Sequence, residues 1–218
     1  MKLLLENWRE YLNEGIDPRI QKQIDRLLAL PDIGVAMRET DRWVAFQYRV
    51  LPGREDVGDL PFGSVSIVKA KKTQTGPCLE GYVVLATGTE PGWGPLLYEL
   101  ALEWASRNGA GLTPDRDSVS HHARAVWDKY ADRAIDKRTL DVDEKQLDID
   151  HKLGGDRDWL KRFKQLTPNY KLDDCDQTMA LNYGGDDEWM NTSLAKMYYK
   201  ETSEVTAALE EAGRLFIL

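Results

Sequence analysis

A strand, a glycine-containing turn and a helix follow one another between residues 82 and 105, and this succession constrains the fold more than any other stretch. The segment 82–87 is apolar and contains paired valines, which is typical of a strand. The turn that follows contains Gly88, Gly92 and Gly94, and Pro95 suits the first turn of a helix. Glycines let a ligand approach the backbone closely, and the first N–H groups of a helix attract anions. The pattern therefore predicts a phosphate-binding turn, with a ligand-free helix start as the alternative.

The hydrophobic periodicity of the remaining chain alternates between helix and strand spacing. Expected helices cover 17–30, 95–107, 120–130 and 203–212, and expected strands cover 33–38, 42–50, 62–70, 79–87, 110–113, 194–200 and 215–218. Several strands follow one another before the first strand–turn–helix unit, so antiparallel neighbours should dominate. The sequence predicts an α+β fold with a mixed, mostly antiparallel sheet flanked by helices.

Changes in charge and periodicity divide the chain into four segments. Residues 1–14 are expected to form an amphipathic helix, because their apolar residues recur at helical spacing. The alternative is a removable tag, because Leu12-Asn13-Glu14 resembles the sites at which prohead proteases of large tailed phages cut targeting peptides. Residues 15–133 are expected to form the core, and 134–193 a charged excursion or small subdomain. Residues 194–218 read as a strand, a helix and a strand that complete the sheet.

Composition narrows the classes of partner and cofactor. A net charge of −8 makes bulk binding to nucleic acid or to an anionic membrane unfavourable. The two cysteines have no metal-binding spacing and there are only three histidines, so no metal cofactor is expected. No apolar run reaches the length of about 20 residues that a membrane span needs. The expected location is the cytoplasm, which means the host cytoplasm or the virion if the chain is encoded by a phage.

Residues from about 79 to 130 resemble the acyl-CoA core of the Gcn5-related N-acetyltransferase (GNAT) superfamily. That family has a strand, Gln/Arg-x-x-Gly-x-Gly/Ala, a helix, a short strand, and a helix that carries Asn-x-x-Ala-x-x-x-Tyr. The corresponding stretches here read Thr89-Glu90-Pro91-Gly92-Trp93-Gly94 and Ser120-His121-His122-Ala123-Arg124-Ala125-Val126-Trp127. The resemblance implies a GNAT-like fold that uses acetyl-CoA or a related acyl-CoA as co-substrate. It also implies the cofactor-binding residues: pantetheine contacts near Leu85 and Thr87, pyrophosphate contacts at Gly92, Trp93, Gly94 and Leu96, and Ser120 at the position of the family asparagine. A serine directly before a helix is also well placed to cap it, so Ser120 is expected to be an N-cap.

The chain departs from the family pattern where catalysis is concerned. Thr89 replaces the Gln/Arg, and Trp127 replaces the tyrosine that protonates the leaving thiolate in many members. An indole cannot act as that acid. Tyr130 lies one helical turn further along and is the candidate substitute, with a packing role as the alternative. Glu90 and His121 are the candidate bases, and His122, Asp115 and Asp117 lie nearby in the sequence.

The resemblance implies an N-acyltransferase that moves an acetyl or similar group from acyl-CoA to the amine of an acceptor, a small molecule or a protein. Because the family tyrosine and Gln/Arg are absent, the alternative is a catalytically inactive GNAT-like binding protein or a virion-internal protein. An enzyme that acts on nucleic acid is a third and weaker interpretation, since the overall acidity opposes it.

Overall fold

The computed structural model describes residues 16–54, 62–69, 81–114, 119–133, 135–139 and 193–218. These residues fall into two compact units. The first unit contains the described residues of 1–67, 85–104 and 201–218, and the second contains those of 68–84 and 105–200. The expected tag at 1–14, the candidates Asp115 and Asp117, and most of the charged segment 134–193 lie outside the described residues.

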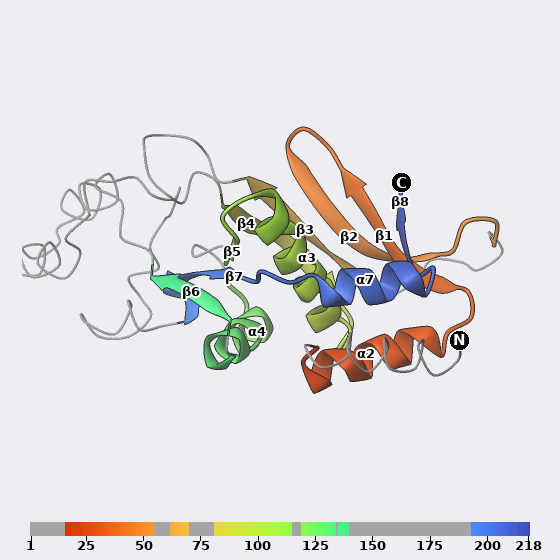
Figure 1. Cartoon of the computed structure of the whole chain (residues 1–218), viewed down its shortest axis with the longest axis horizontal. Coiled ribbons are helices and arrows are strands. Elements are labelled where there is room, and N and C mark those ends of the chain that lie inside the picture. Colours follow the sequence, from red (N-terminus) through yellow and green to blue (C-terminus); the bar gives the residue numbers. More distant parts are fainter. Residues whose placement is uncertain (1–15, 55–61, 70–80, 115–118, 134, 140–192) are drawn as a thin grey trace, which may run out of the picture. The chain divides into compact units, whose positions relative to one another are not determined.

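The first unit contains helices α2 (Pro18–Leu28) and α7 (Glu204–Glu211) and strands β1 (Ile33–Glu39), β2 (Trp43–Val50) and β8 (Leu215–Ile217). It also holds most of β3 (Gly63–Lys69), the second half of β4 (Tyr82–Thr89) and the greater part of α3 (Gly94–Asn108). The strand order here is β4-β3-β2-β1-β8. β1 and β2 form an antiparallel hairpin, and β8 runs parallel to β1 on its other side (Figure 1).

Local sequence explains why α2 begins and how it packs. Asp17 caps the helix by accepting a hydrogen bond of 2.8 Å from the Arg19 N–H, and Pro18 occupies the first turn. Ile20, Ile24 and Leu27 recur at helical spacing and are buried. Gln23 and Arg26 flank this stripe on one side of α2.

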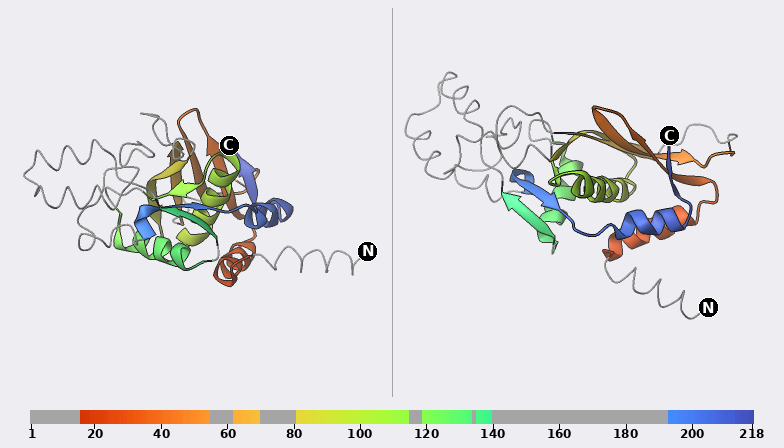
Figure 2. Two further views of the ribbon diagram at one scale, coloured as in Figure 1. Left: turned by 60° about the vertical axis from the view of Figure 1, so that its left-hand side comes forward. Right: turned by 45° about the horizontal axis from the view of Figure 1, so that its top comes forward.

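The second unit contains the first residues of β4, the end of α3, and β5 (Leu112–Thr113), α4 (His121–Asp132), β6 (Asp136–Thr139), the 3₁₀ turn η3 (Ser193–Ala195) and β7 (Lys196–Tyr199). The strand order is β6-β7-β5-β4. β4 and β5 are parallel and pair Tyr82 with Leu112 and Val83 with Thr113. β5–β7 and β6–β7 are antiparallel, and β6 and β7 lie side by side in Figure 2.

The core of the second unit is a group of three aromatic rings. Trp127 stacks on Tyr198 with ring centroids 5.4 Å apart, and Tyr130 packs against both rings. The Tyr198 hydroxyl donates a hydrogen bond of 2.7 Å to the Ser193 carbonyl. Through these contacts α4 is joined to η3 and β7.

The predicted α+β class with mixed, mostly antiparallel strands is confirmed, and every expected helix and strand from residue 17 to 130 and from 194 to 218 is present within a few residues of its expected bounds. β6 was not expected, because Asp136-Lys137-Arg138-Thr139 is polar and lacks the β-branched pattern of a strand. Its pairing with β7 over four residue pairs supplies the hydrogen bonds that its composition does not signal. Among the described residues, no helix is long and apolar enough to cross a bilayer.

Candidate functional site

The second half of β4 is an exposed stretch of strand. Val84 is buried, but all five residues from Leu85 to Thr89 are exposed, and Leu85 keeps 56% of its surface in solvent. A Cβ added at Gly88 would meet no atom within 4 Å, so the space beside this residue is open. An apolar residue and two threonines on an open strand offer both apolar contact and hydrogen bonds to an extended ligand.

The turn between β4 and α3 has a geometry that requires glycine. Gly92 has a φ of +82°, which L-residues with side chains rarely adopt. A Cβ on Gly94 would lie 2.9 Å from the Thr89 hydroxyl oxygen, so a larger residue at the start of the helix would force the Thr89 side chain to move. The turn is held by hydrogen bonds from the Glu90 N–H to the Phe62 carbonyl (3.3 Å) and from the Trp93 N–H to the Glu90 carbonyl (3.1 Å).

Trp93 anchors this turn on an aromatic platform, a name used here for the rings of Tyr48, Phe62 and Trp93. The Trp93 ring is 4% exposed and lies 4.3 Å from the Phe62 ring and 5.1 Å from the Tyr48 ring, centroid to centroid. The Tyr48 hydroxyl donates a hydrogen bond of 2.9 Å to the Trp93 carbonyl. Burial raises the pKa of Tyr48, and the positive charge of Arg26 offsets part of that rise. The expected pyrophosphate residue Trp93 therefore contributes its side chain to the core.

Helix α2 supplies two side chains to the same turn. The Gln23 amide oxygen accepts a hydrogen bond of 2.8 Å from the Leu96 N–H, in the first turn of α3. The Arg26 guanidinium carbon lies 4.0 Å from the centroid of the Trp93 ring. Two of the backbone amides expected to bind pyrophosphate, those of Trp93 and Leu96, thus donate within the chain. This differs from the sequence expectation, because α2 packs beside the turn and local sequence does not reveal that contact.

Thr87 connects the open strand to a buried phenol. Burial raises the pKa of Tyr98, and a hydrogen bond with the Thr87 side chain opposes that rise. Tyr98 is on α3 and buried, whereas Thr87 is exposed on β4. The hydroxyl of Thr87 is therefore held in place at the edge of the open stretch.

The candidates from the second motif lie on α4, in the second unit. The Ser120 hydroxyl caps the helix by accepting a hydrogen bond of 3.2 Å from the Ala123 N–H, as expected from sequence. His121 and His122 are exposed, with their rings edge to face at 5.9 Å. Tyr130 is buried against Trp127 and Tyr198, and the Arg133 guanidinium lies 5.1 Å from its ring centroid.

The structure brings part of the predicted site together. One turn of the first unit, between β4 and the start of α3, contains five of the predicted residues: Glu90, Gly92, Trp93, Gly94 and Leu96. Leu85 and Thr87 precede that turn on β4. His121 and Tyr130 lie on α4 of the second unit, and Ser120 is the N-cap residue of that helix. Sequence reasoning missed Gln23 and Arg26; their only sequence signal is a spacing of three residues, which places both on one side of α2.

The described residues contain no group of three or more His, Cys, Asp or Glu side chains that could hold a metal ion. Comparison with known proteins gives no match, whether to family models, to curated proteins or to solved structures.

Proposed function

We propose that the protein is a GNAT-like acyl-CoA-binding protein that transfers the acyl group to an amine. The observation that supports this most is the open second half of β4, from Leu85 to Thr89, which continues directly into the Gly92 turn and α3. A pantetheine arm carries amides and a thioester, and it can form hydrogen bonds along an accessible strand. The phosphates at its other end are anions, which a glycine turn at a helix N-terminus favours.

The transfer needs orientation and two proton movements. The amine nitrogen attacks the thioester carbon, the new C–N bond forms, and the C–S bond breaks. The proton that the amine loses goes to a base, for which exposed Glu90 and His121 remain the candidates, and the CoA thiolate takes up a proton from an acid. Tyr130 remains the proposed acid from the sequence pattern.

The binding half of this proposal is tested by calorimetric titration with acetyl-CoA. Gly88 offers a matched test, because its open surroundings should accept a larger side chain without strain in the core. Gly88→Leu should weaken acetyl-CoA binding at least about tenfold by filling the open space, at a cost of about 1.4 kcal/mol in binding. The control Ala125→Leu, at an exposed position on α4, should leave affinity unchanged. If titration of the wild-type protein with acetyl-CoA at high micromolar concentrations gives no heat of binding, the proposal is wrong.

A second candidate function is acyl-CoA binding without turnover. It is favoured by the burial of Trp127 and Tyr130 in one aromatic group, where Trp127 stands at the position of the family tyrosine. The two functions differ in thiol release. With acetyl-CoA bound and a panel of primary amines supplied, an acyltransferase liberates free CoA thiol and loses most of that rate in Tyr130→Phe, whereas a binding protein liberates none.

A further inference from the structure

Arg26 is an exposed cation that the chain holds in a fixed place. Its guanidinium lies against the Trp93 ring, and Trp93 is itself fixed by Phe62 and by the Tyr48 hydroxyl. Cation–π stacking on a buried indole restricts the rotamers of an otherwise flexible side chain. A guanidinium that is already ordered loses less conformational entropy when it binds a ligand.

The fixed guanidinium also lies at the open side of Gly92. A Cβ added at Gly92 would be 3.4 Å from Arg26 Nη1 and would meet no other atom within 4 Å. Among the described residues Arg26 has no carboxylate partner, and the ion pair found there joins Arg54 to Asp32 instead. In a chain of net charge −8, a cation that has no acidic partner among the described residues and lies at an exposed glycine turn can bind an anion.

Two backbone N–H groups at this turn are not available to bind the phosphate. The N–H groups of Trp93 and Leu96 already donate to the Glu90 carbonyl and to the Gln23 side chain. Thr89, which precedes the turn, is uncharged and directs its hydroxyl toward Gly94. With these two N–H groups engaged, a side-chain cation would strengthen phosphate binding at this turn, and the Arg26 guanidinium lies against the Trp93 ring there.

We propose that Arg26, held on the Trp93 ring, binds a phosphate oxygen of the acyl-CoA beside Gly92. The inference rests on the proposed function for the identity of the ligand. Arg26 contributes to the affinity for acyl-CoA through charge-assisted hydrogen bonds from its planar guanidinium to the phosphate. It takes no part in the acyl transfer itself. The guanidinium on its ring, rather than the N-terminus of α3, defines this site.

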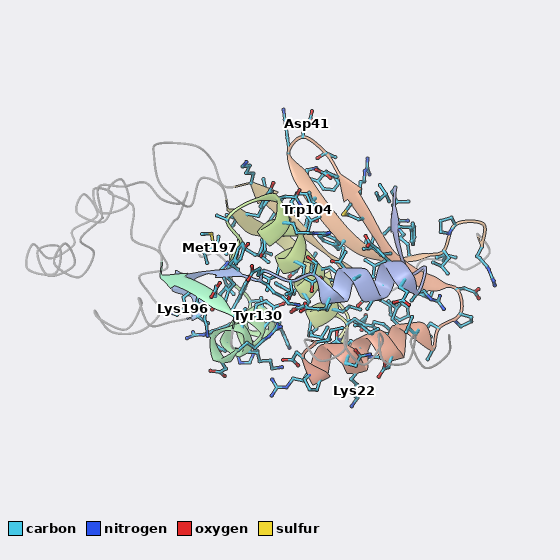
Figure 3. All side chains as sticks on the ribbon, in the orientation of Figure 1. Lys22, Asp41, Trp104, Tyr130, Lys196 and Met197 are labelled. Carbon is cyan, nitrogen blue, oxygen red and sulfur yellow. The ribbon has the colours of Figure 1, made fainter. Side chains whose placement is uncertain are left out.

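The experiment compares Arg26→Gln, Arg26→Lys and Lys22→Gln by calorimetry with CoA. Lys22 is the matched control because it removes the same charge from the same helix, and its side chain extends away from α2 into open space (Figure 3). Arg26→Gln should weaken CoA binding by about tenfold and Arg26→Lys by about threefold, since a lysine keeps the charge but not the stacked plane. Lys22→Gln should stay within about twofold of the wild type.

A second probe, inorganic pyrophosphate, separates this inference from the proposed function. If CoA binds to the wild type and Arg26→Gln behaves like Lys22→Gln, the role of Arg26 is overturned and the proposed function stands. If pyrophosphate binds in an Arg26-dependent way but CoA does not, the anion site stands and the acyl-CoA proposal fails. If neither binds, both are overturned. The circular dichroism of each variant should match that of the wild type. The melting temperature of Arg26→Gln should fall only slightly, because the lost cation–π contact involves an exposed side chain.

Discussion

Glu103 is a fully buried carboxylate on α3, and its partners come from a distant part of the chain. One oxygen accepts a hydrogen bond of 3.1 Å from the Val205 N–H, and the other accepts from the Thr206 N–H (2.8 Å) and the Thr206 hydroxyl (2.7 Å). The side chain of Ser203, the N-cap residue of α7, makes no capping hydrogen bond. Glu103 thus caps α7 from another helix, which explains how a carboxylate is tolerated in the core.

Removal of that cap should be among the most destabilising single changes in the first unit. Glu103→Ala leaves the first N–H groups of α7 buried without an acceptor, so the free energy of unfolding should fall by about 3 kcal/mol. Glu103→Gln keeps one oxygen and should lose less. Urea denaturation measures both, with Glu210→Ala on the exposed side of α7 as control. A loss for Glu103→Ala no greater than that of Glu210→Ala would contradict the capping role.

At the scale of elements, the contact between β3 and β4 depends on a missing side chain. Gly63 opens β3 with a φ of +102°, and a Cβ there would collide with the Gly88 carbonyl oxygen and the Thr89 backbone. Gly53 has a similar φ of +81° but no atom within 4 Å of an added Cβ. The two positions therefore share the conformational cost of a non-glycine residue and differ in the steric cost.

This pair gives a controlled prediction. Gly53→Ala should cost about 1–2 kcal/mol, the usual cost of a left-handed L-residue. Gly63→Ala should cost clearly more, because the strands must separate where β4 meets the turn. Thermal and urea unfolding compare the two variants, and acetyl-CoA titration should show weaker binding only for Gly63→Ala. Equal stability losses would show that β3 and β4 can move apart without penalty.

Features that depend on local sequence could be predicted, whereas contacts between distant segments could not. Alternating apolar residues were enough to predict the strands at 33–38 and 42–50, which form the β1–β2 hairpin, since strand signals are local. The glycine turn and the Ser120 cap were predictable for the same reason. Gln23 and Arg26 were not, because the Gln23–Leu96 hydrogen bond joins residues 73 positions apart and no local pattern records which helix packs beside a turn. β6 was missed because pairing, rather than composition, makes it a strand.

At the scale of the whole molecule, three buried phenols link stability to alkaline pH. Burial raises the pKa of Tyr48 and Tyr98 in the first unit and of Tyr198 in the second. For Tyr198 the negative charges of Asp128 and Asp132 raise it further. Each phenol stays protonated in the folded protein at a pH where the unfolded chain has already ionised.

The sign of the pH dependence follows from proton counting. Below pH of about 10 both states hold the phenolic protons, so these groups contribute their full stabilisation. Above that value the unfolded chain binds fewer protons than the folded one, and the free energy of unfolding falls by about 1.4 kcal/mol per pH unit for each buried phenol. Urea unfolding at several values between about pH 8 and pH 11 should show this slope, and Tyr48→Phe and Tyr198→Phe should each make it shallower. Phenolate absorbance gives an independent check, because these tyrosines should ionise together with unfolding. Ionisation of all nine tyrosines while the fold persists would contradict the burial on which the prediction stands.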